Sequence, residues 1–236
     1  MNSTKNQKTI LLNSLHTEEI AYWVGVFQSD GYFKKQYVKS KKRMRYFISL
    51  SVSDKSLLML EKFRRISQKY FKIKGSVYQT YFNHKLNHFR FGCQQILRLL
   101  NELDVFYKNP VSPPAWVLQE EYLFGAYLAG LIDGDGDVRI SRKKYPQCKV
   151  RIHGSKEPKR LVAEIERHLK CGAHSTIRIR VNKLKGRVFK SRGSVTEFAI
   201  SKKNILFINK YVVPHLTLEY KKDKIMKIKK RAVPGI

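Results

Sequence analysis

Apolar and polar positions along the chain form a pattern that occurs twice. The apolar runs at residues 23–31 and 128–136 both end in Asp-Gly, and Asp135 follows Asp30 by 105 residues. After each run come two alternating segments, a helical pattern, a second pair of alternating segments and more helix. Alternation with period two indicates strands, and a period of about 3.6 indicates helices. We therefore predict an α+β fold built from two αββαββα repeats.

The expected strands follow directly from this alternation. They are residues 33–38, 46–52, 77–82 and 88–92 in the first repeat, and 138–141, 149–153, 176–184 and 194–201 in the second. The helices between the strand pairs place Leu57, Leu60 and Phe63, or Leu161, Ile165 and Leu169, on one face. Residues 220–231 predict a further, basic amphipathic helix.

The ends of the two apolar helices carry their own signals. Thr17 is expected to begin the first helix, because a threonine hydroxyl accepts a hydrogen bond from a free amide of the first turn. That helix is expected to run to about Ser29, and the second from about residue 119 to residue 134. Gly31 and Gly136 are expected to adopt the left-handed conformation that commonly ends a helix.

A proline-rich segment at residues 109–114 separates the repeats. Its three prolines lack backbone N–H donors and resist helix, which indicates a connector. We therefore expect one domain at residues 1–114, including this connector, and a second at residues 115–236.

The composition narrows the class of partner. The 236 residues are 42% hydrophobic, which suits a globular protein, yet 48 basic and 18 acidic residues leave a net charge of +30. An excess of this size indicates a polyanionic partner, with nucleic acid the leading candidate. Neither a membrane-spanning run nor a secretion signal is evident, so an intracellular protein without a membrane partner is expected. Cys93, Cys148 and Cys171 match neither a disulfide framework nor a zinc pattern.

The two repeated aspartates lie where a carboxylate is electrostatically disfavoured. Asp30 and Asp135 fall at the C-terminal ends of their helices, where partial negative charge collects unless a cation offsets it. The same helices carry small residues that allow close helix packing, namely Ala21, Gly25, Gly125, Ala126, Ala129 and Gly130. If the helices pack side by side, both carboxylates face one site. A divalent metal would suit that site.

Arginines alternate with apolar residues in several expected strands. Residues 177–181 read Ile-Arg-Ile-Arg-Val, so one sheet face is apolar and the other carries guanidinium groups. A two-stranded ribbon fits the major groove of duplex DNA, where arginine bonds guanine and other basic groups neutralise phosphates. The candidate DNA-contacting residues are Lys34, Lys35, Tyr37, Lys39, Gln79, Tyr81, Arg90, Arg139, Arg151, His153, Arg178, Arg180, Lys183 and Arg187.

The segment Leu-Ala-Gly-Leu-Ile-Asp-Gly-Asp-Gly at residues 128–136 resembles the LAGLIDADG motif of homing endonucleases, and residues 23–31 resemble a more diverged copy. The resemblance implies a monomer whose two pseudo-symmetric repeats form saddle-shaped antiparallel sheets that straddle DNA. It implies that Asp30 and Asp135 bind a divalent metal, Mg²⁺ or Mn²⁺, with backbone carbonyls of Ser29 and Gly134. Ca²⁺ is expected to support binding without cleavage.

The same resemblance implies a catalytic lysine after the later helix of each repeat. Position favours Lys108 in the first repeat and Lys221 in the second. The expected reaction is hydrolysis of both strands of double-stranded DNA at a long target site, leaving a staggered break. Gln28 and Asp133 occupy a motif position that is not a metal ligand, and Asp133 is expected to be structural.

Two alternatives share the same basic surface. An RNA maturase of this fold would bind intron RNA and help it fold, and it can keep both motif aspartates. A DNA-binding regulator built on the same repeat would bind without dependence on metal. Keeping both aspartates favours cleavage.

Overall fold

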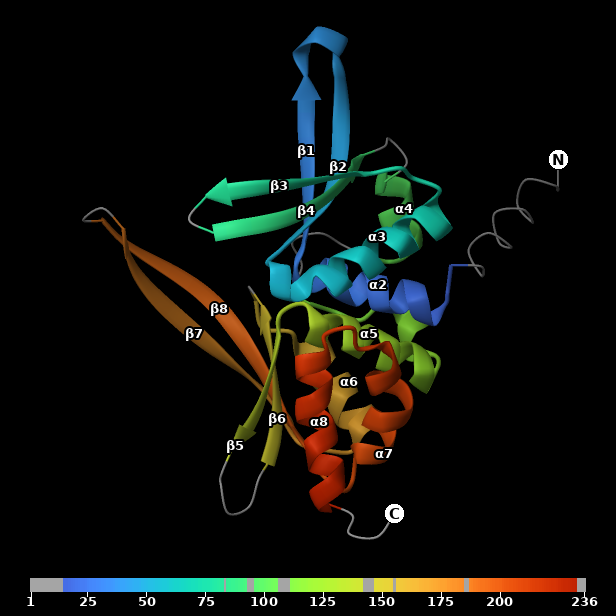
Figure 1. Ribbon diagram of the computed structural model, residues 1–236, viewed down its shortest axis with the longest axis vertical. Helices are drawn as coiled ribbons and strands as arrows, with labels where there is room; N and C mark the ends of the chain where they lie inside the picture. Colours follow the sequence, from blue (N-terminus) through green and yellow to red (C-terminus); the bar gives the residue numbers. More distant parts are fainter. Residues whose placement is uncertain are drawn as a thin grey trace, which may run out of the picture.

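The computed structural model consists of two four-stranded antiparallel sheets with helices packed between and beside them (Figure 1). It describes residues 15–82, 84–92, 96–105, 111–141, 147–154, 156–184 and 187–232. Strand order is β1-β2-β4-β3 in the first sheet and β5-β6-β8-β7 in the second, so each half repeats the other's topology. The predicted α+β fold with two repeats is confirmed.

The first half contains α2(Glu18–Ser29), β1(Gly31–Val38), η1(Lys39–Lys41), β2(Arg43–Val52), η2(Asp54–Ser56), α3(Leu57–Phe71), β3(Ser76–Phe82), β4(His84–Gly92) and α4(Ile96–Glu102). The second contains η3(Ala115–Leu118), α5(Glu121–Asp133), β5(Gly136–Ser141), β6(Gln147–Gly154), α6(Lys159–Leu169), β7(Ala173–Leu184), β8(Arg187–Ile200), α7(Ile205–Phe207), η4(Ile208–Val212), η5(Val213–His215) and α8(Glu219–Ala232). The expected division near residue 114 falls between α4 and η3 and stays a prediction.

The start of α2 is set by local chemistry, as predicted. Thr17 is extended, and its hydroxyl accepts a hydrogen bond from the Ile20 amide at 3.3 Å. Glu18 and Glu19 occupy the first turn, where the positive end of the helix dipole stabilises them.

The expectation of left-handed glycines at the ends of α2 and α5 is wrong. Neither Gly31 nor Gly136 has a positive φ, and each begins a strand instead. Glycine is needed there for space: a Cβ on Gly31 would lie 2.4 Å from the Phe27 carbonyl oxygen, and one on Gly136 would lie 2.3 Å from that of Ile132. No side chain fits where the chain turns from helix into strand.

The helices α2 and α5 pack backbone to backbone at the centre of the molecule (Figure 1). A Cβ on Gly25 would lie 2.2 Å from the Tyr127 carbonyl oxygen, and one on Gly130 would lie 2.2 Å from that of Tyr22. These reciprocal contacts confirm the predicted close helix pair. Gly125 does not take part, because a Cβ there would meet Tyr211 of η4.

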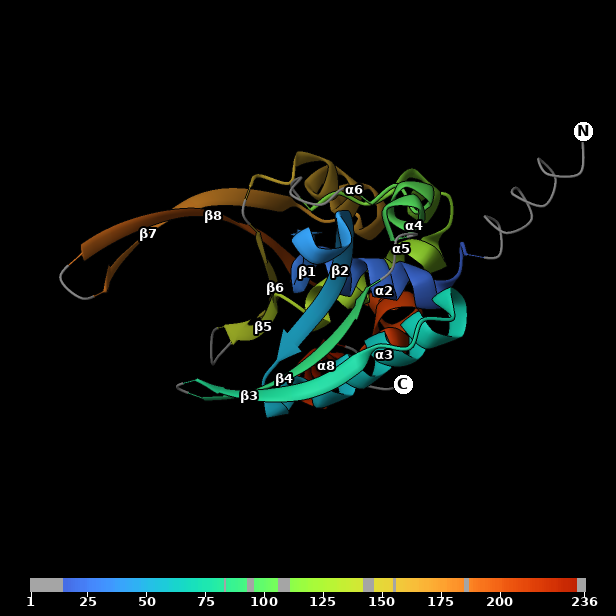
Figure 2. The ribbon, with the colours of Figure 1, turned by 90° about the horizontal axis from the view of Figure 1, so that it is seen from above.

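Each sheet buries one face against the helices. In the first sheet Ile48, Leu50, Phe89 and Phe91 are buried, and the register pairs Ile48 with Phe91 and Leu50 with Phe89. Side chains alternate along a strand, so the residues between these point away from the helices. Figure 2 shows both sheets curving to the same side of the α2–α5 pair.

None of the described helices is long and apolar enough to cross a membrane. Cys148 and Cys171 are free thiols, Cys148 being buried, and Cys93 lies outside the described residues.

Candidate metal centre and basic sheet faces

Two carboxyl groups, one from each half, meet where α2 and α5 end. Asp30 caps the C-terminus of α2, and its backbone N–H donates to the carbonyls of Val26 and Phe27. Asp135 follows α5 after Gly134. The two side chains hydrogen-bond to each other and are partly exposed. Close packing of the two helices therefore brings together aspartates that lie 105 residues apart in the sequence.

The electrostatics of this pair favour a cation. Burial raises the pKa of the Asp30 carboxyl, and the Lys221 ammonium opposes that rise. Burial, followed by the charge of Asp30, raises the pKa of Asp135 to about 7. Two carboxylates this close cannot both ionise easily, so Asp135 retains a proton near neutral pH. A divalent cation would compete with that proton.

The residues before the two aspartates also face each other. A Cβ on Gly134 would lie 2.0 Å from the Ser29 hydroxyl oxygen, so Ser29 and Gly134 are adjacent across the helix pair. The Ser29 hydroxyl donates back to the carbonyls of Gly25 and Val26 at 3.0 and 3.1 Å. The two expected carbonyl ligands thus belong to the same small region.

Lys221 reaches this region from α8. Its ammonium donates to the carbonyl oxygens of Ile132, Asp133 and Gly134 at 2.6, 2.8 and 3.3 Å. The side chain is buried, and burial lowers its pKa, while nearby aspartates, Asp133 first, oppose that change. The carbonyls at the end of α5 thus form a position that attracts positive charge, as expected at a helix C-terminus.

The donor set fits a hard divalent cation. It consists of two carboxylates and the carbonyl oxygens at the helix ends, and oxygen ligands of this kind suit Mg²⁺ and Ca²⁺. Among the described residues there is no cluster of three or more His, Cys, Asp or Glu side chains that could hold a metal. Mg²⁺ commonly uses only one or two carboxylates and takes its other ligands from water and substrate phosphate.

Sequence reasoning missed Lys62, a half-buried lysine beside the helix pair. Its ammonium donates to the His215 carbonyl at 2.5 Å and lies 3.5 Å from the centre of the Tyr22 ring. Burial lowers its pKa to about 8, although the charge of Asp133 opposes the shift. Lys62 joins α3 of the first half to η5 of the second, and only the fold brings these elements together.

The first sheet places two of the predicted DNA-contacting side chains on the face turned from the helices. Arg90 pairs with Ser49, and its guanidinium lies 3.9 Å from the centre of the Phe47 ring. Lys34 pairs with Phe47 and shares this face. Arg45, Tyr78 and His88 lie on this face as well and were missed. Arg45 and His88 alternate with the buried residues of β2 and β4, which is a signal in the sequence, whereas Tyr78 of β3 is placed there only by its pairing with His88.

The other candidates of the first sheet fall at different positions. Lys35, Tyr37, Gln79 and Tyr81 alternate with the residues of that face, so register puts them on the opposite side, near the exposed strand ends. The Gln79 amide donates to Asn87 at 2.8 Å, and the Tyr81 hydroxyl donates to Gln79 at 3.1 Å. Lys39 lies in η1, at the tip of the β1–β2 hairpin.

The second sheet gathers cations on the face turned from its helices, where carboxylates accompany some of them. The register puts Arg139, Lys149, Arg151, His153 and Arg178 on this face, opposite the buried Cys148, Val150 and Ile152. Glu197 pairs with Lys149 at 2.6 Å and with Arg151 at 2.5 Å. Arg139 pairs with Asp137. Some of the predicted cations are therefore partly neutralised by neighbouring acids.

Several predicted residues cannot be placed. Lys108 lies outside the described residues, as do the side chains of Arg180, Lys183 and Arg187.

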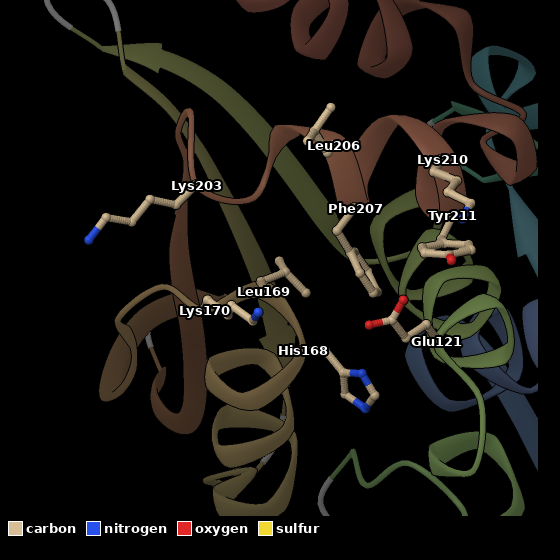
Figure 3. Close-up of a pocket in the computed structure, with 9 residues that line it drawn as sticks. All are labelled: Glu121, His168, Leu169, Lys170, Lys203, Leu206, Phe207, Lys210 and Tyr211. Carbon is tan, nitrogen blue, oxygen red and sulfur yellow. The ribbon is translucent and has the colours of Figure 1, made fainter.

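A hollow on the helical side of the second half is separate from the carboxyl pair. It has a volume of about 250 Å³, and Figure 3 shows His168, Phe207 and Glu121 turned toward it. Glu121 begins α5, whereas the carboxyl pair lies just beyond the other end of this 13-residue helix. At 1.5 Å per residue the two sites are about 20 Å apart along the helix axis.

No protein-family profile and no curated protein sequence matches this chain. Solved structures do match. A mesophilic variant of the homing endonuclease I-DmoI is 17% identical, with a TM-score of 0.52 over 83% of this chain and 95% of that one. I-WcaI bound to its DNA recognition sequence is 16% identical, with a TM-score of 0.51 over 87% of this chain and 85% of that one. The LAGLIDADG homing endonuclease I-GzeII in complex with its DNA target is 15% identical, with a TM-score of 0.50 over 89% of this chain and 91% of that one.

Two further structures hold I-DmoI variants with their target DNA, one in the presence of manganese and one in the presence of magnesium. At these identities, the likeness establishes the fold.

Proposed function

We propose that this chain, which has the fold of the LAGLIDADG homing endonucleases, is itself a site-specific DNA endonuclease that uses a divalent metal. The observation that carries the proposal is the direct contact between Asp30 and Asp135, each supplied by one half at the end of its central helix. The I-DmoI structures with target DNA and manganese or magnesium support the choice of substrate and cofactor.

Each part of the site has a role in hydrolysing a phosphodiester. Asp30 and Asp135 would hold the cation, with the carbonyls of Ser29 and Gly134 as further ligands. A bound divalent metal supplies an activated water and neutralises charge at phosphorus. The Lys221 ammonium, fixed by three carbonyls, stabilises negative charge that develops nearby. Lys108 is proposed for the matching role in the first half.

The basic sheet faces hold the duplex across this centre. Both sheets lie on the same side of the α2–α5 pair, so one bound duplex contacts both and passes the carboxyl pair (Figure 2). In this proposal Arg90 and Lys34 contact the duplex from the first sheet. The contacts from the second sheet are made by Arg139, Arg151, His153 and Arg178. The two repeats act on opposite strands and so give a staggered double-strand break. The chain acts as a monomer because it already contains both repeats.

The proposal is tested by selecting cleaved sequences from a randomised DNA library with purified protein and Mg²⁺. We expect recovery of one long, asymmetric target that is cut on both strands, with no cutting when EDTA removes the metal. Ca²⁺ in place of Mg²⁺ should leave binding intact without cleavage. Failure to cut any duplex, together with tight binding of intron RNA, would instead favour an RNA maturase, and metal-independent duplex binding alone would favour a regulator.

A separate prediction concerns the acid on the second sheet. Glu197→Gln removes the partner of Lys149 and Arg151 and frees both cations for phosphates. We expect tighter duplex binding at low salt, and a slope of log affinity against log salt that steepens by about 0.9 for each additional phosphate that the protein neutralises. Anisotropy titrations at several salt concentrations measure both.

The matched control is Glu164→Gln, which breaks a similar ion pair with Arg167 on α6, away from the sheets. It should leave DNA affinity unchanged. Equal effects from both substitutions would show that the change in net charge, not the sheet face, controls binding.

A further inference from the structure

A hydrogen-bond arrangement recurs across the central helices with the same 105-residue spacing as the motif. The Tyr22 hydroxyl donates to the Asp133 carboxylate at 2.8 Å, and the Tyr127 hydroxyl donates to the Gln28 side-chain oxygen at 2.6 Å. Tyr127 follows Tyr22, and Asp133 follows Gln28, by 105 residues. Each tyrosine is fully buried and reaches the motif residue of the opposite helix.

Each arrangement includes a third residue, Ser112 in the first half and Thr217 in the second, and the hydrogen bonds to these two residues run in opposite directions. Thr217 follows Ser112 by the same spacing. The Thr217 backbone amide donates to Asp133 at 2.7 Å, whereas the Gln28 amide donates to the Ser112 carbonyl at 3.0 Å. A carboxylate only accepts hydrogen bonds, while an amide side chain also donates. Asp133 therefore binds backbone N–H groups, and Gln28 binds a carbonyl.

The amides that Asp133 binds belong to the two residues that immediately precede α8. The Leu218 amide also donates to Asp133, at 3.3 Å, and the Leu218 carbonyl accepts the first helical hydrogen bond, from the Lys221 amide at 2.9 Å. The first amides of a helix lack partners within the helix and carry partial positive charge. Asp133, from α5, thus caps α8.

This cap determines where Lys221 lies. Lys221 is in the first turn of α8, and its ammonium returns to the carbonyls of residues 132–134. Two sets of hydrogen bonds therefore join the end of α5 to the start of α8. The Asp133 carboxylate accepts from backbone amides, and the Lys221 ammonium donates to backbone carbonyls. In the first half, Trp116 stands 105 residues before Lys221 and donates its indole N–H to the Leu103 carbonyl at 3.0 Å.

We propose that Asp133 is a positioning residue for cleavage, which fixes the position of Lys221 relative to Asp135. The Tyr22 hydroxyl in turn orients the Asp133 carboxylate. The inference rests on the proposed endonuclease function. It assigns different roles to the two equivalent motif residues: Asp133 supports the chemistry, whereas Gln28 links the helix interface to the Ser112 carbonyl of the connector.

The test compares two hydroxyl deletions at equally buried tyrosines on the two central helices. Tyr22→Phe loses the hydrogen bond to Asp133 together with the 2.8 Å contact to the Thr217 hydroxyl, and Tyr127→Phe loses the hydrogen bond to Gln28. We expect Tyr22→Phe to lower kcat on the selected target by about threefold to tenfold, the range for one lost hydrogen bond. Tyr127→Phe should change kcat by less than about twofold, although both variants lower the Tm.

Asp133→Asn should have the larger effect. Its amide group would face the Thr217 and Leu218 amides, and we expect kcat to fall by about a hundredfold through misplaced groups, with duplex affinity in Ca²⁺ nearly unchanged. Hydrogen exchange gives a readout that is independent of cleavage: exchange of the amides at residues 217 and 218 should accelerate in Asp133→Asn and Tyr22→Phe but not in Tyr127→Phe.

Equal kcat losses for the two tyrosine variants, or unchanged exchange at residues 217 and 218 in Asp133→Asn, would overturn the positioning role. A wild-type chain that cuts no DNA would instead overturn the proposed function, so the two failures are distinguishable.

Discussion

Replacing Asp30 or Asp135 by asparagine is expected to slow cleavage of both strands by about a thousandfold. In the proposed reaction the metal would supply several kcal/mol of stabilisation at phosphorus, and each ~1.4 kcal/mol corresponds to a factor of ten in rate. Asparagine keeps the shape of the side chain but cannot offer a full negative charge to the cation. Single-turnover cleavage of end-labelled target in Mg²⁺ measures the rate for each strand.

In the absence of metal at pH 8, the same two variants should have a higher free energy of unfolding than the wild-type protein. The folded protein raises the pKa of Asp135 from its ordinary value of 3.8 to about 7, so folding favours the protonated form. The contribution of the protonated Asp135 carboxyl to wild-type stability is therefore lost as the pH rises from about 4 through 7, because both carboxyls then become charged. Asparagine does not titrate, so the advantage of the variants should disappear near pH 4.

Asp223→Asn is the matched control for this pair of measurements. Asp223 is exposed on α8. Its substitution should leave cleavage and the pH dependence of stability unchanged. Full cutting by Asp30→Asn or Asp135→Asn would contradict the assignment of the metal site.

The second large effect is expected from the closest helix contact. Gly130→Ala would place a methyl carbon 2.2 Å from the Tyr22 carbonyl oxygen, a contact that backbone must move to relieve. We expect a loss of about 3 kcal/mol in the free energy of unfolding, the upper part of the range for overpacked cores. For a chain of this size that loss lowers the Tm by roughly 6–12 °C.

Cleavage should fall together with stability in Gly130→Ala, because separating α2 from α5 also separates Asp30 from Asp135. Gly25→Ala makes the reciprocal contact with the Tyr127 carbonyl and should behave alike. Gly172→Ala is the control, since a Cβ there meets nothing within 4 Å. Chemical denaturation measures all three, and equal stability of Gly130→Ala and Gly172→Ala would show that the helices separate without cost.

Much of the fold was predictable because its signals are local. Alternation located the eight strands, although β8 begins seven residues before the expected residue 194 and β4 four before residue 88. Apolar periodicity located α3 and α6, and Thr17 marked the start of α2. The conformations of Gly31 and Gly136 were not predictable, because both glycines are required by contacts with the preceding helix rather than by a positive φ. Left-handed residues instead end α3 and α6, at Lys72 and Lys170.

The candidate site was predictable in part for the same reason. Repetition of Asp-Gly after two apolar helices pointed to Asp30 and Asp135 before their contact was known. Lys62 carried no signal of this kind, since it is one lysine among many in the sequence. The ion pairs of Glu197 with Lys149 and Arg151 were also invisible, because they join different strands through sheet register.

The sequence by itself determined the two repeats, their helices and strands, the paired aspartates and the strong positive charge. These properties depend on residue type and spacing along the chain. Tertiary structure alone decided that the aspartates touch, that Lys221 binds the carbonyls at the end of α5, and that Asp133 caps α8 while Gln28 does not cap its counterpart. Those contacts depend on how α2, α5 and α8 pack against one another, and the distance between α2 and α5 is set by small residues on both surfaces at once.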